Sequence, residues 1–339
     1  METSLFDYSL PSELIAQEPV EPRDASRLMV VDRAGGRIEH RHFRDLPDYL
    51  RPADVLVVNE SKVIPARLVG SREGGGRVEV LLVRRLTPGR WEALVRPARR
   101  VRVGDRLGFG NGELEARVRE EGPQGRRLLE FEAAGEVEEA IRRLGQTPLP
   151  PYIRRPAPLE RYQTVYARQE GSVAAPTAGL HFTPELLSTI RARGIAIVPV
   201  VLHVGPGTFR PVRTEKVEEH RLEAEYYRLP PEAVAQIEEA RRRGGRVVAV
   251  GTTVVRVLET VAGRYGSLVP GEGWADAFIY PGHRFRAVDA LITNFHLPRS
   301  TLLMLVCAFA GRERVLEAYR MAVEHRYRFY SFGDAMLIL

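Results

Sequence analysis

The sequence predicts an α/β fold in which both ends of the chain form one α/β domain and a small antiparallel β-barrel is inserted between them. Beyond residue 148, β-branched strand segments alternate with amphipathic helix patterns, which is typical of a mostly parallel sheet. The middle of the chain instead holds short alternating strands between turn signals, which indicate a small barrel or meander. A buried strand comes before this region. We therefore expect residues 1–68 and 148–339 to form the α/β domain and residues 69–147 to form the barrel.

The elements of the first half follow from alternation and turn residues. After an opening loop region, strands are expected at 27–32 and 54–59, both rich in Val and Leu. Barrel strands, separated by Gly- and Pro-containing turns, are expected within 77–86, 91–100, 103–121 and 126–132. A short helix at 136–144 and a proline-rich linker complete the insertion.

Capping residues define the elements of the second half. Thr183 and Pro184 start a helix that Gly194 ends, and Ser300 or Thr301, after Pro298, starts another that Gly311 ends. The other expected elements are strands at 195–204, 246–251 and 287–293, and helices at 231–243 and 253–262.

Composition narrows the class of protein. The single cysteine, Cys307, lies in an apolar helix and excludes an internal disulfide; it also makes a cysteine-ligated zinc or iron–sulfur site implausible, so a cytoplasmic location is expected. The longest apolar run, 302–310, is far shorter than the about 20 residues that cross a bilayer, so no membrane association is expected. The net charge of +6 permits a nucleic-acid partner. Nearly all basic residues are arginines, which bind phosphates and stack on bases, although a codon bias toward arginine would give the same count.

Four polar loops lie at the ends of expected strands or the starts of expected helices. Ligands bind at the carboxyl ends of strands in open α/β sheets, and helix N-termini offer free amides, so these loops predict one binding site. Their candidate residues are Thr177, Gly179, His181, Phe182, His203, Gly205, Gly207, Thr208, Phe209, Thr252, Thr253, Arg256, Asn294, His296 and Ser300.

Each loop also has a purely structural interpretation. The polar residues could only cap helices, His203 could be a core histidine, and Arg256 could form a surface ion pair with Glu259. Gly205 and Gly207 could form a tight turn, and they are not a dinucleotide fingerprint because position 210 is Arg.

Two further patterns combine histidine, basic and aromatic residues. His40 and His42 share a strand face, but no third ligand is suggested, so we expect solvated side chains and no metal site. Residues 325–334 interleave basic and aromatic residues, as a surface for unstacked bases would, or form a closing strand with an apolar face.

Long motifs carry a resemblance to a known family. They are FDYSLPSELIAQ, RDASRLMV, NESKVIPARL, VAAPTAGLHFT, LHVGPGTF, GTTVVRVLE, FIYPGHRFRAVDALITNFHLPRSTLLMLVCAFAG and YRFYSFGDAML. In this order they span nearly the whole chain, which resembles the S-adenosylmethionine:tRNA ribosyltransferase-isomerase family of queuosine biosynthesis. The family fold is an α/β domain with an inserted β-barrel, in agreement with the prediction above.

The resemblance implies a bacterial cytoplasmic enzyme that transfers and isomerises the ribosyl part of S-adenosylmethionine onto 7-aminomethyl-7-deazaguanine (preQ1) at the tRNA wobble position. Its products would be epoxyqueuosine-tRNA, adenine and methionine. S-adenosylmethionine is then a substrate, so no cofactor is expected, and we expect a monomer.

Site roles follow as hypotheses. His181, His203 and His296 are candidates for proton transfer. The threonines with Asn294 and Ser300 would position the nucleoside, and Phe182, Phe209 or Tyr280 would face adenine or the sulfonium. Arg326 and Arg328 are the candidate contacts to tRNA phosphates.

The chain departs from the family pattern at several positions. Asn59-Glu60 replaces a frequent Asn-Asp, and His283 replaces a frequent Tyr. In a region resembling a His-x-Met-His-x-Glu pattern, His220 and Glu225 remain, but Leu222 and Glu223 replace Met and the second His. A role for that second His is therefore not carried over to this chain.

Three other functions are less well supported. A dinucleotide-dependent oxidoreductase lacks its glycine fingerprint, and a radical S-adenosylmethionine enzyme needs more than one cysteine to hold its cluster. A non-catalytic tRNA-binding module would explain the charge and the barrel, but not the polar loops.

Overall fold

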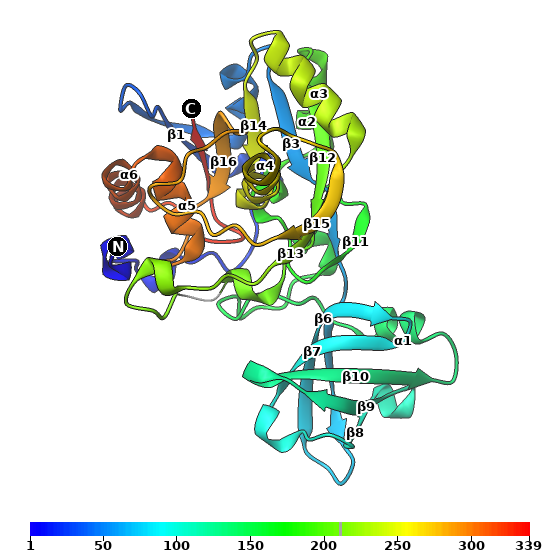
Figure 1. Cartoon of the computed structure of the whole chain (residues 1–339). Coiled ribbons are helices and arrows are strands. Elements are labelled where there is room, and N and C mark those ends of the chain that lie inside the picture. Colours follow the sequence, from blue (N-terminus) through cyan, green and yellow to red (C-terminus); the bar gives the residue numbers. More distant parts are fainter. Residues whose placement is uncertain (210–211) are drawn as a thin grey trace.

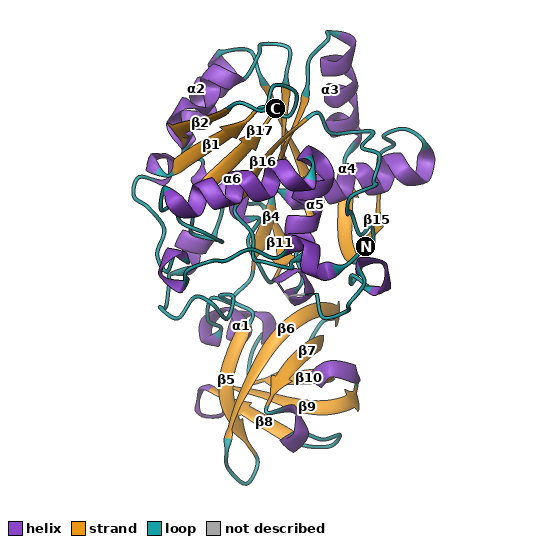
Figure 2. Ribbon diagram, turned by 90° about the vertical axis from the view of Figure 1, so that its left-hand side faces the viewer, coloured by secondary structure: helices purple, strands orange, loops and turns teal. Residues whose placement is uncertain are grey.

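The computed structural model describes residues 1–209 and 212–339, and only the backbone of Thr208 and Phe209. The chain forms a large α/β part and a smaller β-barrel beside it (Figure 1). Figure 2 shows the same two parts from the side, with helices around the large sheet and the barrel strands below it. The predicted fold class is confirmed.

A nine-stranded sheet forms the centre of the α/β part, in the order β15-β13-β12-β3-β14-β16-β17-β1-β2. Strands β12, β3, β14 and β16 run parallel to one another, so their carboxyl ends share one edge of the sheet. In the order of the sheet, the strands are β15 Gly271–Ala275, β13 Glu225–Leu229, β12 Ala196–Leu202, β3 Val55–Asn59, β14 Val247–Val250, β16 Ala290–Asn294, β17 Ala335–Ile338, β1 Arg27–Val31 and β2 Ile38–His42.

Helices cover both faces of this sheet. In β3, Val55 and Val57 belong to one core, which also holds residues of α3, α4, α5 and α6, whereas Leu56 and Val58 belong to the core that holds α2. Strands buried on both faces need continuous apolar sequences, which explains the runs seen in β3, β14 and β16. The helices are α2 Pro184–Ala192, α3 Pro231–Arg242, α4 Thr252–Tyr265, α5 Thr301–Ala310 and α6 Arg312–Glu324.

The predicted helix starts are confirmed by their caps. The hydroxyl of Thr183 accepts a hydrogen bond from the amide of Leu186, and that of Ser300 accepts one from the amide of Leu303. Helix α6 was not predicted, because it begins directly after Gly311 without a separate turn. No helix in the described ranges has the length and apolar character needed to cross a bilayer.

The barrel closes in the order β10-β7-β6-β5-β8-β9. Its strands are β5 Arg67–Arg72, β6 Arg77–Thr87, β7 Arg90–Arg96, β8 Arg106–Phe109, β9 Leu114–Glu121 and β10 Arg126–Ala133. Helix α1, Val137–Leu144, adds Ala140 and Ile141 to the barrel core. The limits 69–147 for the inserted domain stay a prediction. Outside the barrel, β4 Ser61–Val63 and β11 Gln169–Ser172 form a short parallel pair.

The aromatic segment near the C-terminus differs from both of its interpretations. Residues 325–334 come before the strand, which starts only at Ala335. Tyr327, Phe329 and Phe332 are buried in the cores, so they offer no surface for unstacked bases. The ring of His40 contributes to this packing, since its Nδ1 lies 2.7 Å from the Tyr327 hydroxyl.

Candidate active site between the sheet and the barrel

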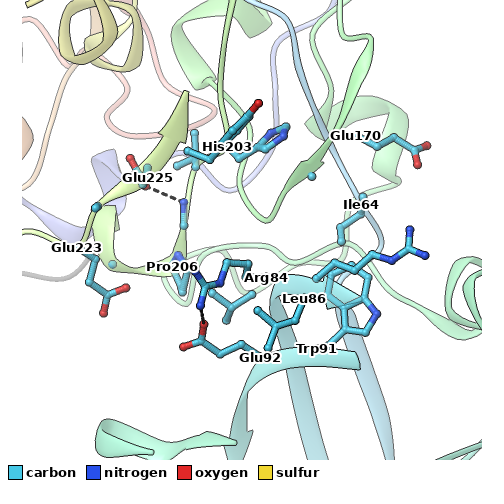
Figure 3. Close-up of a pocket in the computed structure, with 18 of the residues that line it drawn as sticks. Ile64, Arg84, Leu86, Trp91, Glu92, Glu170, His203, Pro206, Glu223 and Glu225 are labelled. Atoms are coloured by element: carbon cyan, nitrogen blue, oxygen red, sulfur yellow. Dashed lines mark hydrogen bonds and ion pairs between the residues drawn. The ribbon is translucent and has the colours of Figure 1, made fainter. Parts of the chain in front are cut away.

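A cleft of about 800 Å³ lies between the carboxyl edge of the large sheet and the barrel. Residues from both parts line it. In Figure 3, His203 lies on the side of the sheet, across the cleft from Arg84, Leu86 and Trp91 of the barrel. A volume of this size accepts a nucleoside-sized ligand.

His203 is the candidate histidine that reaches this cleft. It follows β12, and its Nδ1 lies 2.8 Å from the hydroxyl oxygen of Ser61, which follows β3. The imidazole also stacks on Tyr226, with ring centroids 5.5 Å apart. Burial lowers the pKa of His203 from 6.5 to about 4, because desolvation disfavours the imidazolium. The ring is therefore neutral at physiological pH.

Gly171 leaves the space that this imidazole needs. A Cβ atom at position 171 would lie 2.6 Å from Nε2 of His203. Gly171 also has a φ of +146°, which residues other than glycine rarely adopt. The backbone of β11 therefore passes directly over the ring.

Glu225 fixes the glycine turn at the floor of the cleft. Its Oε1 accepts a hydrogen bond of 2.7 Å from the amide of Gly205, drawn as a dashed line in Figure 3. Its Oε2 forms an ion pair with Arg256, whose other guanidinium nitrogen donates to the carbonyl of Ala275 at 2.8 Å. Gly205 and Gly207 both line the cleft.

The surface ion pair considered for Arg256 and Glu259 is wrong. Both side chains are buried, because α4 lies under the sheet and its loops, and each finds a different partner. Arg256 pairs with Glu225, whereas Glu259 accepts from the amides of Arg286 and Ala287 and lies 3.2 Å from His283. Arg256 therefore reaches the cleft only through Glu225.

Glu223, at the position where the family pattern has its second His, connects the two parts of the molecule. It forms an ion pair with Arg126 of β10, which also pairs with Glu92 of β7. All three residues line the cleft.

A second group of predicted residues gathers behind the cleft. Two hollows of about 30 Å³ each, room for single waters, share Thr177, Asn294 and His296. Thr252 and Thr253 line one hollow, and Ser300 lines the other. Val204 lines both the cleft and the hollow that contains Thr252 and Thr253.

His296 and Asn294 are engaged with neighbouring side chains. Nε2 of His296 lies 2.8 Å from the Thr293 hydroxyl, and burial lowers the pKa of His296 to about 3. The Thr177 hydroxyl donates to Oδ1 of Asn294 at 3.1 Å.

His181 is also buried, and both of its nitrogens have partners. Nδ1 lies 2.7 Å from the Ser26 hydroxyl, and the Asn294 amide donates to Nε2 at 3.2 Å. Its ring stacks on Phe43, and burial lowers the pKa of His181 to about 3. Phe182 is fully buried beside Phe43, so it faces no ligand space. Gly179 allows close packing, since a Cβ there would meet the Tyr166 hydroxyl at 2.0 Å.

The remaining predicted residues lie away from the cleft, or their side chains are outside the described part of the chain. Tyr280 packs beside Phe278 and does not line the cleft. Arg326 is exposed, and the guanidinium of Arg328 donates to the carbonyl of Glu18. The side chains of Thr208 and Phe209 lie outside the described residues.

Ser61, the partner of His203, and several residues that line the cleft were not predicted from the sequence. Ser61 could have been found by the rule used for the other loops, because it follows the predicted strand 54–59. No sequence signal marked Tyr226, Trp274, Trp91 or Arg126, because their place depends on how the barrel lies against the sheet.

Comparison with known proteins decides the family. The family model described as "Queuosine biosynthesis protein" matches residues 3–338. The chain belongs to this family. A curated protein of Moorella thermoacetica named S-adenosylmethionine:tRNA ribosyltransferase-isomerase is 65% identical over 337 residues, covering 98% of both chains.

Two other relatives extend the match. A protein of the same name from Symbiobacterium thermophilum is 61% identical over the full length of both chains. The crystal structure of S-adenosylmethionine tRNA ribosyltransferase from Thermotoga maritima is 47% identical, with a TM-score of 0.57, over 99% of this chain and 100% of that one. The predicted membership in the S-adenosylmethionine:tRNA ribosyltransferase-isomerase family is confirmed, and this is a family of enzymes of queuosine biosynthesis.

Proposed function

We propose that this chain transfers and isomerises the ribosyl part of S-adenosylmethionine onto preQ1 at the wobble position of tRNA. The products are epoxyqueuosine-tRNA, adenine and methionine. The observation that carries this proposal is the cleft of about 800 Å³ with a neutral imidazole, His203, on its sheet side. The names of the full-length relatives support the class of reaction.

His203 is the proposed base for the first step. The sulfonium acidifies the neighbouring C5′ protons, and a neutral imidazole whose Nε2 has no hydrogen-bond partner among the described residues can accept one of them. The resulting ylide opens the sugar and expels adenine. The aminomethyl nitrogen of preQ1 then attacks, the carbon ring closes, and an alkoxide displaces methionine to leave the epoxide.

The lining of the cleft suits a cationic substrate. Tyr226 and Trp91 supply aromatic rings that attract a sulfonium, whereas the carboxylates of Glu170, Glu223 and Glu225 are already held in ion pairs. The amide of Gly205 is already bound by Glu225, so this pair serves to hold the turn rather than to bind an oxyanion.

His181 and His296 are proposed to position other groups and not to move protons. Their nitrogens contact Ser26, Asn294 and Thr293 in buried surroundings, away from the cleft. Thr177, Thr252, Thr253, Asn294 and Ser300 then form the polar wall behind Val204. In this proposal the enzyme acts as a cytoplasmic monomer, without a cofactor, on tRNA that carries preQ1.

The test is adenine release by the purified chain from S-adenosylmethionine and preQ1-tRNA, together with the mass of the modified nucleoside. We expect His203→Asn to lose most turnover, while His181→Asn and His296→Asn keep turnover in proportion to the folded fraction. His325→Asn changes an exposed histidine and is the matched control. Full turnover of His203→Asn would refute the assignment of the base, and absence of adenine release by the unaltered chain would refute the function.

A further inference from the structure

The chain has two tryptophans, Trp91 and Trp274, and both line the cleft. Trp91 is buried in the barrel core, but Trp274 of β15 is 44% exposed. Aromatic side chains that are open to solvent provide the faces on which unpaired nucleic-acid bases stack.

Trp274 belongs to an aromatic ladder that leads to His203. We define this ladder as His203, Tyr226 and Trp274. Tyr226 and Trp274 are cross-strand partners in the β13–β15 pair, so their side chains share one face of the sheet. Their ring centroids lie 6.1 Å apart, and those of Tyr226 and His203 lie 5.5 Å apart. The exposed indole is thus two ring contacts away from the proposed base.

A guanidinium from the barrel faces the exposed end of the ladder. Arg84 of β6 lies over the Trp274 ring at 5.5 Å from its centroid and also pairs with Glu92 at 3.2 Å. Because Glu92 already pairs with Arg84, this arginine is poorly suited to bind a phosphate. The indole of Trp274 can instead offer a flat face to a nucleobase.

We propose that Trp274 is the stacking platform for an unpaired tRNA base next to the base that is modified. This inference rests on the proposed function. A base that is modified at His203 has to leave its stack, and its neighbour then loses a stacking partner. An indole at the outer end of the aromatic ladder replaces that partner.

A nucleobase at Trp274 could also come from the adenosyl group of S-adenosylmethionine. The position of the indole favours the RNA. The sulfonium has to lie beside His203 in a site from which water is excluded, whereas Trp274 is open to solvent and two rings away.

Steady-state kinetics test this assignment. We expect Trp274→Ala to raise the KM for preQ1-tRNA about tenfold, equal to about 1.4 kcal/mol, with little change in the KM for S-adenosylmethionine. Trp274→Phe should keep most of the affinity, because phenylalanine still stacks. The slope of tRNA affinity against salt should not change, since no phosphate contact is lost.

Tyr265→Ala is the matched control. Tyr265 is 61% exposed at the end of α4 and does not line the cleft, so its loss should leave both KM values unchanged. Equal tRNA KM values for Trp274→Ala and the unaltered chain would overturn the proposal, and so would a rise confined to the KM for S-adenosylmethionine.

Fluorescence gives a direct readout that does not depend on turnover. In Trp91→Phe, Trp274 is the sole tryptophan, and an anticodon stem-loop RNA should quench it in the absence of S-adenosylmethionine. Quenching by S-adenosylmethionine alone, or by neither ligand, would overturn the proposal. If the chain quenches with RNA but never releases adenine, the proposed function fails while the platform stands. Circular dichroism shows whether Trp91→Phe is folded. The kinetic comparison of Trp274→Ala with the unaltered chain does not depend on the Trp91→Phe variant.

Discussion

The hydroxyl oxygen of Ser61 lies 2.8 Å from Nδ1 of His203, so the imidazole, which follows β12, is held by a residue of β4 in the short parallel pair with β11. If Nδ1 carries the proton and donates it to Ser61, Nε2 keeps its lone pair and can act as a base. Ser61 is then a positioning residue for His203.

We expect Ser61→Ala to lower kcat about tenfold with little change in either KM, because a displaced imidazole meets the C5′ proton less often. The acidic limb of the pH–rate profile should also move to lower pH, since the hydroxyl stabilises the imidazolium that forms. Ser331→Ala removes a buried hydroxyl contact of the same kind, to Tyr152, and should leave kcat unchanged. An unaltered kcat and pH profile for Ser61→Ala would show that the contact has no part in turnover.

Gly171 gives a second test of the same geometry. In Gly171→Ala, the new methyl carbon would lie 2.6 Å from Nε2 of His203, so the two groups would overlap. The imidazole can swing away, so we expect a folded protein with adenine release reduced about a hundredfold. Gly263→Ala is the control, because a Cβ at position 263 of α4 meets nothing within 4 Å and should leave release unchanged. Normal release by Gly171→Ala would contradict the assignment of His203.

The carboxyl edge of the sheet could be predicted from the sequence because its determinants are local. Apolar runs such as 54–59 and the caps Thr183 and Ser300 each act within a few residues, so the loops that follow could be assigned to one edge.

The division of that edge into a cleft and small buried hollows could not be predicted. Phe43 stacks on the ring of His181, and Tyr8 and Tyr319 form hydrogen bonds with the backbone of His296, so both histidines are buried by residues that are distant in sequence. The sequence pattern makes all three histidines equally good candidates for proton transfer, whereas packing leaves only His203 of the three beside the cleft. The barrel side of the cleft, with Arg84 and Trp91, depends on docking of two domains and has no local signal.

The buried histidines predict sensitivity to acid. Burial lowers the pKa of His181 and His296 to about 3, below the 6.5 of an unfolded chain. The unfolded chain therefore binds protons first as the pH falls below 6.5, and the stability that these groups contribute is complete above that pH and is lost progressively toward pH 3.

Urea unfolding at several pH values measures this effect. We expect the free energy of unfolding to fall between about pH 7 and about pH 4.5, and His296→Gln to fall less steeply because one such group is gone. His42→Asn changes an exposed histidine and should follow the unaltered chain. Parallel curves for His296→Gln and the unaltered chain would show that His296 is not the source.

The ion pair between Glu225 and Arg256 predicts coupling between stability and activity. Both side chains are buried, so Arg256→Met removes the guanidinium that balances the buried charge of Glu225 and should cost about 3–5 kcal/mol of unfolding free energy. The same change removes the partner that fixes Glu225, so the Gly205 amide loses a fixed acceptor, and adenine release should fall by more than the loss of folded protein explains.

The double variant Arg256→Met with Glu225→Gln removes both charges and should recover part of the stability, while the turn stays less well held. Arg242→Met breaks an exposed pair with Glu239 and should cost at most about 1 kcal/mol. If the double variant were no more stable than Arg256→Met alone, the cost would come from lost packing of the arginine side chain and not from the buried charge.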